Sequence, residues 1–167
     1  AYGSAGERCM AISAVVAVGA AADPLVKLIE KKARAIKVGP GDAEGVEMGP
    51  LVTAQHRDKV AGYIEKGKAE GAKAVLDGGK PPVQEGFFLG TTLFDHVKPE
   101  MSVYKDEIFG PVLVVTRVQT LEEAIALINR NPYANGTAIF TESGGAARRF
   151  ENEIQVGMVG VNVPIPV

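Results

Sequence analysis

Hydrophobic positions along this chain follow two spacings, one typical of buried strands and one typical of amphipathic helices. The runs Val15 to Val18 and Pro111 to Val118 are continuous and rich in β-branched residues, which predicts strands buried on both faces. After Asp23-Pro24, read as N-cap and first helical residue, apolar side chains recur every three or four positions up to Ile36, which predicts a helix. The other predicted elements are a helical turn at 9–14, strands at 73–76, 137–140 and 156–161, an extended run at 87–94, and helices at 53–71, 120–131 and 143–154.

Strands and helices alternate in this pattern, which predicts an α/β fold with a largely parallel sheet flanked by helices. The chain has 167 residues, enough for one domain with a real core, and its 46% hydrophobic content is typical of globular proteins. It starts on Ala1-Tyr2 rather than Met and ends on Pro164-Ile165-Pro166-Val167, so we expect a piece of a longer protein.

Charge and composition exclude several classes of partner. The net charge is −2, with both signs mixed along the chain, whereas nucleic-acid binding needs a basic face. The longest apolar stretch, Cys9 to Ala22, is too short to span a bilayer and is broken by Ser13 and Gly19. His56 and His96 are isolated, so no metal site is expected, and His56 is interpreted as a solvated residue on a helix face. We therefore expect no nucleic acid, membrane or metal partner.

Cys9, the single cysteine, is the first candidate for chemistry. It follows a run of small residues, Gly3 to Gly6, and Arg8 places a positive charge beside it. A helix starting at Cys9 would favour the thiolate through its free N–H groups and dipole. A thiolate can attack a carbonyl carbon and later leave, which suits covalent catalysis. The alternative is a buried, inert cysteine.

Glu107 and Phe109 form a second candidate site. Gly110-Pro111 opposes helix, so the preceding residues are predicted to be extended, with Glu107 and Phe109 on the same side. A carboxylate beside an aromatic ring suits a ribose with an attached flat ring. The alternative is a surface glutamate and a core phenylalanine. Asn135-Gly136 is interpreted as a turn, and Asn162 as making a turn hydrogen bond.

Several motifs occur in order along nearly the whole chain, and together the sequence resembles the aldehyde dehydrogenase superfamily. Within it, the runs Arg8 to Ala11, Asn135 to Phe140 and Gly160 to Val167 are most similar to the methylmalonate-semialdehyde dehydrogenase branch. The motifs that carry the wider resemblance are Gly6-Glu7-Arg8-Cys9, Gly49-Pro50-Leu51-Val52, Glu107-Ile108-Phe109-Gly110-Pro111-Val112, Asn131 to Phe140 and Val159-Gly160-Val161-Asn162.

The resemblance implies a role for each candidate residue. Cys9 is the expected nucleophile, and its backbone N–H contributes to the oxyanion hole. Glu107 is expected to hold the nicotinamide ribose of NAD, and Phe109 to flank the nicotinamide. Arg8 either pairs with the substrate carboxylate or has a structural or thiolate-activating role. The expected chemistry is oxidation of malonate or methylmalonate semialdehyde through a thioacyl enzyme, with NAD as cofactor, coenzyme A as co-substrate, no metal, and loss of carbon dioxide.

The resemblance also implies limits. Residues 1–167 are expected to be a single cysteine-bearing catalytic domain, without the NAD-binding domain and the C-terminal segment of the longer enzyme. That enzyme is expected to be a homo-oligomer, dimer or tetramer, in the cytoplasm of a bacterium or the mitochondrial matrix of a eukaryote. The branch usually has Gln in place of Glu7, which we expect to point away from the thiol. The alternatives are a hydrolytic dehydrogenase, or a folded assembly module without turnover.

Overall fold

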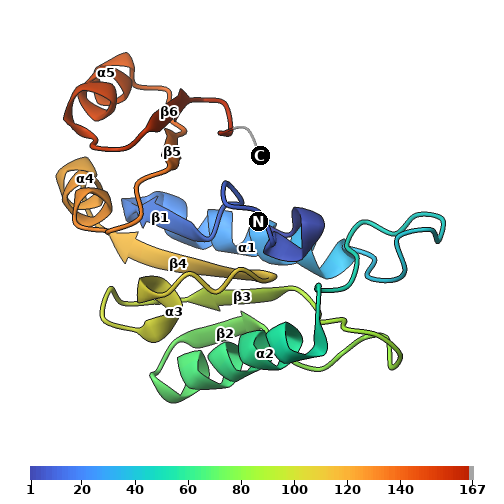
Figure 1. The fold of residues 1–167 in the computed structure, drawn as a ribbon. Helices are drawn as coiled ribbons and strands as arrows, with labels where there is room; N and C mark the ends of the chain where they lie inside the picture. Colours follow the sequence, from blue (N-terminus) through green and yellow to red (C-terminus); the bar gives the residue numbers. More distant parts are fainter. Residues whose placement is uncertain (166–167) are drawn as a thin grey trace.

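A four-stranded sheet organises the larger part of the chain in the computed structural model, which describes residues 1–165 (Figure 1). Pro166 and Val167, the end of the branch-like run noted above, lie outside the described residues. The strand order is β1 (Ala14–Val18), β4 (Val112–Val118), β3 (Thr92–Asp95) and β2 (Lys73–Leu76). β4 is parallel to both β1 and β3, and only β2 runs antiparallel to its neighbour. The predicted largely parallel sheet is confirmed.

Helices cover both faces of this sheet, as predicted. In Figure 1 helix α1 passes behind the strands, while α2 and α3 lie on the near side. Before α1 come the 3-10 turns η1 (Gly3–Gly6) and η2 (Gly19–Ala21). The helices are α1 (Ala22–Ala35), α2 (Ala54–Ala69) and the short α3 (Ser102–Lys105).

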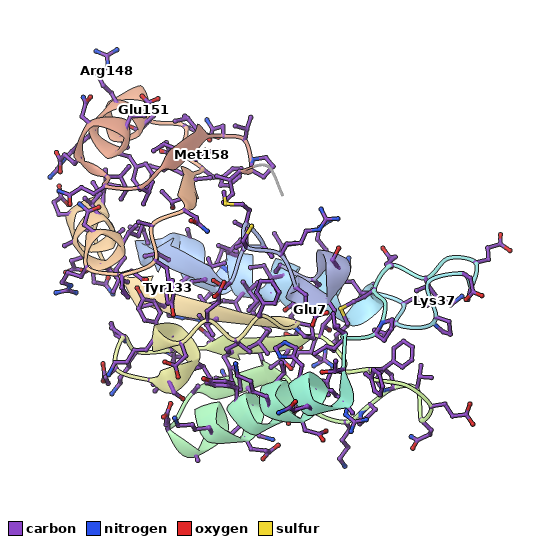
Figure 2. All side chains as sticks on the ribbon, in the orientation of Figure 1. Glu7, Lys37, Tyr133, Arg148, Glu151 and Met158 are labelled. Carbon is purple, nitrogen blue, oxygen red and sulfur yellow. The ribbon has the colours of Figure 1, made fainter. Side chains whose placement is uncertain are left out.

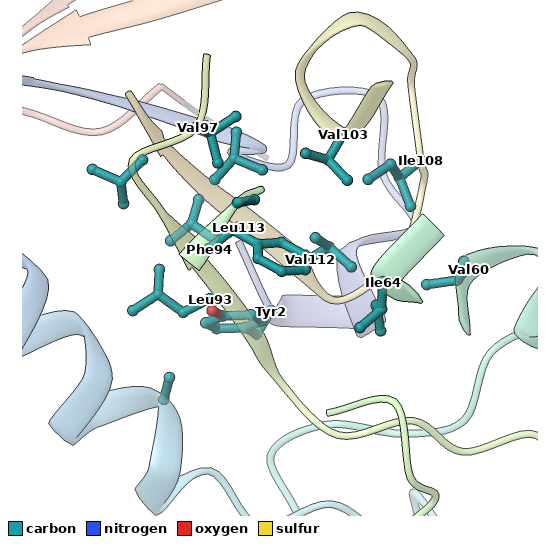
Figure 3. Close-up of a cluster of buried hydrophobic side chains, with 14 of the residues drawn as sticks. Tyr2, Val60, Ile64, Leu93, Phe94, Val97, Val103, Ile108, Val112 and Leu113 are labelled. Carbon is teal, nitrogen blue, oxygen red and sulfur yellow. The ribbon is translucent and has the colours of Figure 1, made fainter. Parts of the chain in front are cut away.

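The main core fills the space between the sheet and these helices (Figure 3). Leu93 and Phe94 on β3 and Val115 on β4 have no exposed surface. Tyr2 joins this core from the N-terminus, and its buried hydroxyl donates a 2.8 Å hydrogen bond to the carbonyl of Thr92. Burial raises the pKa of Tyr2. The segment that leads to Cys9 is therefore anchored to the centre of the sheet.

An ion pair between a buried carboxylate and a partly exposed guanidinium joins β3 to β4. Asp95 is 1% exposed and accepts hydrogen bonds from Arg117 Nε at 2.9 Å and Nη2 at 2.6 Å, and from the His96 N–H at 2.7 Å. Burial alone would raise the pKa of Asp95, but these hydrogen bonds outweigh it and leave the pKa below its usual range. A third guanidinium nitrogen of Arg117 reaches Asp23 at 2.7 Å.

A second, smaller layer follows β4. The parallel strands β5 (Gly136–Ile139) and β6 (Met158–Val161) pack with α4 (Leu121–Asn129) and α5 (Gly144–Glu153) around Ile125, Phe150 and Ile154. Asn162 ends β6 with φ +56°, and its amide exchanges two hydrogen bonds with the backbone of Thr141, at 2.8 and 2.9 Å. The side chain of Asn162 is thus hydrogen-bonded, but to a residue 21 positions away and not within a local turn as predicted, and the pair holds the ends of β5 and β6 together.

The N-cap residues predicted from the sequence can be compared with the observed starts of the helices. Thr53 and Thr120 cap α2 and α4 as predicted, accepting N–H groups at 3.1 and 3.2 Å. The prediction for Asp23 is wrong, because α1 begins at Ala22, two residues before the predicted first helical residue Pro24, and has Ala21 as its N-cap without a side-chain hydrogen bond. Asp23 pairs with Arg117 instead. Within residues 1–165, no helix combines the length and apolar character that a bilayer crossing needs.

Candidate active site

A cavity of about 640 Å³ lies between β1 and the smaller layer, and all four residues singled out from the sequence line it. Arg8 and Cys9 come from the loop after η1, and Glu107 and Phe109 from the loop that leads into β4. The structure therefore brings together two loops that are about a hundred positions apart in the chain.

Cys9 is exposed, so its thiol is accessible and the alternative of a buried cysteine is wrong. The predicted helical turn over 9–14 is also wrong. Arg8 and Ala11 close a single turn with a 3.0 Å backbone hydrogen bond, and the chain then enters β1 at Ala14. A helix dipole therefore does not act on the thiol. The turn exposes both Arg8 and Cys9, as adjacent residues, to the same cavity.

Asn135 supports the nucleophile loop from the smaller layer. Its side-chain amide donates a 3.1 Å hydrogen bond to the carbonyl of Cys9, and the residue itself lines the cavity. The sequence indicated only a turn at Asn135-Gly136. No local pattern connects two residues that are 126 positions apart, so this support became visible only in the structure.

The loop before Cys9 has an unusual backbone. Ser4, Ala5 and Gly6 take φ values of +51°, +53° and +73°, a left-handed turn that costs L-residues about 1–2 kcal/mol each. At Gly6 the turn meets the other loop directly, because a Cβ there would lie 2.1 Å from the carbonyl oxygen of Gly110. Only glycine allows this approach. The loops of Cys9 and Phe109 are thus in main-chain contact.

Glu107 and Phe109 are exposed on either side of buried Ile108, so both reach the cavity as predicted. Phe109 is 38% exposed, which excludes the alternative of a core phenylalanine. The predicted extended backbone is wrong at Phe109, whose φ is +60°. A hydrogen bond to its carbonyl accompanies this conformation: Nε2 of His56 lies 2.7 Å from the Phe109 oxygen.

His56 is not the solvated residue that the sequence indicated. Its side chain is only 22% exposed and lies between the Phe109 carbonyl and Glu7, whose Oε1 is 3.5 Å from Nε2. Glu7 also accepts the N–H of Val52 at 3.4 Å. Figure 2 labels Glu7 where η1 approaches the start of α2. Among the described residues that line the cavity, Glu7 is absent, so it points away from the thiol as expected.

Most of the remaining cavity wall is apolar, with residues from β1, β4 and β5, and Asp106 adds a second carboxylate beside Glu107. Across residues 1–165, no group of three or more His, Cys, Asp and Glu side chains is arranged to hold a metal ion. The chemistry that this site offers therefore comes from one exposed thiol, a neighbouring guanidinium, and a carboxylate next to an aromatic ring.

Known proteins give an independent view of the chain. A family model described as the aldehyde dehydrogenase family matches residues 1–167. A malonate-semialdehyde dehydrogenase from Pseudomonas aeruginosa is 58% identical over 100% of this chain and 34% of its own length. One from Geobacillus thermodenitrificans is 51% identical over 99% of this chain and 35% of its own length.

Solved structures agree. The crystal structure of a methylmalonate-semialdehyde dehydrogenase from Oceanimonas doudoroffii superimposes with a TM-score of 0.96 at 53% identity, covering 100% of this chain and 35% of that one. A 1-pyrroline-5-carboxylate dehydrogenase from Thermus with bound NAD superimposes with a TM-score of 0.93 at 35% identity, covering 99% of this chain and 32% of that one. The chain spans 34–35% of the length of the curated relatives named here. It belongs to the aldehyde dehydrogenase family.

Proposed function

We propose that this chain is the cysteine-bearing catalytic domain of an NAD-dependent, CoA-acylating dehydrogenase for malonate and methylmalonate semialdehydes. The observation that carries the proposal is the placement of Cys9 and Arg8, adjacent and exposed, on one cavity with Glu107 and Phe109. The 58% identity to a malonate-semialdehyde dehydrogenase supports this choice of substrate. The nucleotide-binding domain and a C-terminal segment would belong to the rest of the full-length protein.

Cys9 would form the covalent bond to the substrate. Its thiolate attacks the aldehyde carbon, a C–S bond forms, and the carbonyl oxygen takes up the negative charge. The main-chain N–H of Cys9 would be a donor to this oxygen. Asn135 contributes indirectly, because its bond to the Cys9 carbonyl restricts the peptide that carries the thiol.

Arg8 would select the substrate. A semialdehyde of this class carries a carboxylate at the end opposite the aldehyde, and a guanidinium next to the nucleophile can pair with it. Because Arg8 and Cys9 share one turn, the two ends of a short substrate can be bound by neighbouring residues.

The cavity residues fit NAD. Glu107 is exposed on the cavity and, as a carboxylate, accepts hydrogen bonds from vicinal hydroxyls; Phe109 presents an exposed ring to a flat heterocycle. Bound NAD supplies the hydride acceptor of the reaction. Glu107 and Phe109 would orient only its nicotinamide end.

Coenzyme A would release the product. Once the Cys9 adduct is a thioester, attack by the CoA thiol forms a new thioester and returns the sulfur of Cys9. The substrate carboxylate leaves as carbon dioxide, its bonding electron pair stays on the adjacent carbon, and that carbon is then protonated. Acetyl-CoA or propanoyl-CoA results.

The test compares two aldehydes in the full-length protein. Arg8→Leu should lower kcat/KM for malonate semialdehyde far more than for propanal, which has no acid group. Losing one partner of a charged contact costs roughly 2–5 kcal/mol, so the selectivity should fall at least tens-fold. Arg148→Leu is the matched control, because Arg148 on α5 points into solvent (Figure 2).

Three results would refute the proposal or correct it. If the wild type does not oxidise malonate semialdehyde with NAD and CoA, the proposed function is wrong. Free acid in place of acyl-CoA, identified by mass spectrometry of the products, would indicate the hydrolytic alternative. Equal losses for both aldehydes would assign Arg8 to thiolate activation.

A further inference from the structure

We propose that His56, oriented by Glu7, is a positioning residue that holds the main chain of Phe109 and so sets the Phe109 ring against the cofactor. The proposal rests on the proposed function only for the role of Phe109 toward NAD. The positioning itself follows from contacts between residues of this chain.

The first contact is the hydrogen bond between His56 Nε2 and the Phe109 carbonyl, at 2.7 Å. A carbonyl oxygen only accepts, so Nε2 must carry a proton, and this contact fixes the tautomer of a neutral His56. The backbone of His56 is held separately, because its N–H donates to Thr53 Oγ1 at the start of α2. The ring can therefore serve Phe109 without being needed to cap the helix.

The second contact explains why the ring stays in place. Glu7 Oε1 lies 3.5 Å from the same nitrogen, and the Glu7 side chain is only 9% exposed. A carboxylate also only accepts, so it favours the N–H on Nε2 and opposes the tautomer that would release Phe109. The Val52 N–H, 3.4 Å from Glu7 Oε1, restrains the carboxylate in turn.

The held residue needs such support. Phe109 has φ +60°, a conformation that aromatic residues rarely adopt, and the residue is 38% exposed. Rotation of the released peptide toward a common backbone conformation would move the ring away from its present place on the cavity. A strained backbone conformation of this kind persists only where contacts with the surrounding structure hold it in place.

The contacts also connect the two halves of the site. Glu7 lies two positions before Cys9, whereas Phe109 belongs to the loop proposed to face the cofactor. His56 contacts both Glu7 and Phe109, and the neighbouring residues Gly6 and Gly110 are in main-chain contact. These contacts thus hold the loop of Cys9 and the loop of Phe109 in a fixed position relative to each other.

The test uses the full-length protein and two readouts, neither of which is turnover. Hydrogen exchange of the segment 107–112, without cofactor, reports the hold on Phe109, and NADH fluorescence titration reports the cofactor site. His56→Leu should accelerate exchange in this segment and weaken NADH binding, each by about tenfold, the effect of losing one hydrogen bond. His56→Gln, whose amide can donate to the same carbonyl, should restore most of both.

Controls separate positioning from a structural role. His96→Asn changes the other histidine, which is exposed and has φ +55°, a value that Asn tolerates, and should leave both readouts unchanged. Glu7→Gln keeps an acceptor without the charge and should accelerate the exchange by less than His56→Leu does. It also provides the test if His56→Leu does not fold.

The proposal is overturned if exchange at 107–112 is unchanged in His56→Leu, or equally fast in His56→Leu and His56→Gln. If Glu7→Gln is the only variant that folds, unchanged exchange of the segment 107–112 in Glu7→Gln overturns the proposal. These outcomes are independent of the substrate. A wild type that oxidises no semialdehyde would refute the proposed function, yet the exchange comparison would still decide whether His56 holds Phe109.

Discussion

Gly6 is the point at which the loop of Cys9 touches the loop of Phe109, and one added methyl group there tests whether their spacing matters. In Gly6→Ala the new Cβ would lie 2.1 Å from the Gly110 oxygen, whereas ordinary contact begins at 3.4 Å. The positive φ of +73° alone costs alanine about 1–2 kcal/mol. Relief of the overlap moves the two main chains apart by roughly 1 Å, and a displacement of that size can cost about 100-fold in rate.

The assay is single-turnover NADH formation by the full-length protein with malonate semialdehyde, together with urea unfolding. Gly6→Ala should react about 100-fold more slowly and lose at least the ~1–2 kcal/mol of backbone strain in unfolding free energy. Gly3→Ala is the matched control in the same turn, because a Cβ at Gly3 meets nothing within 4 Å. Equal rates for the two variants would refute the reasoning that the loop spacing controls the reaction.

Two further predictions concern supports of the site. Asp95→Asn should lower the unfolding free energy at pH 7 by about 1.5–3 kcal/mol, because the hydrogen bonds of Arg117 to the buried carboxylate lose their charged acceptor while its pair with Asp23 remains. The lowered pKa of Asp95 means that this stabilisation is present above the unfolded value of 3.8 and is lost as pH falls through the folded value. Urea titrations at pH 7 and in acid measure it, and an equal loss at both pH values would contradict it. Asn135→Asp should slow alkylation of Cys9 by iodoacetamide about tenfold at neutral pH, because the side chain can no longer donate to the Cys9 carbonyl and a carboxylate next to that residue disfavours the thiolate. Asn129→Asp, at the end of α4, is the control. An unchanged rate in Asn135→Asp would count against the support role.

The sequence predicted those features whose causes are local. Thr53 and Thr120 cap helices because their side chains reach N–H groups three residues ahead. The β-branched runs became β1 and β4, and β4 is buried over its first five residues because it fits a sheet covered on both faces. The predicted burial of β1 is wrong except at Ala17, because β1 is the edge strand and borders the cavity. The sequence placed Glu107 and Phe109 on the same side because side chains alternate along an extended chain. The structure keeps this alternation, with Ile108 buried between them, even though Phe109 is not extended.

Features that depend on distant partners were missed. His56 has charged neighbours in sequence, but its ring meets Phe109, 53 positions away, once α2 packs beside the loop before β4. Asp23 has the residue type of an N-cap, yet a guanidinium from β4 competes for its carboxylate. At Cys9 the strand β1 starts too soon for a helix to form first. In each case tertiary contacts decided between conformations that the local sequence allowed.

The central claim is that Cys9 carries the substrate covalently, and its most direct test is mass spectrometry of the full-length protein. The protein is mixed with malonate semialdehyde and NAD in the absence of CoA, digested and mapped. The wild type should show an acyl mass added to the Cys9 peptide, and addition of CoA should remove it. Cys9→Ala should show no adduct while unfolding at the same urea concentration, because residue 9 is exposed and alanine leaves no cavity. An adduct on Cys9→Ala, or none on the wild type, would contradict the claim.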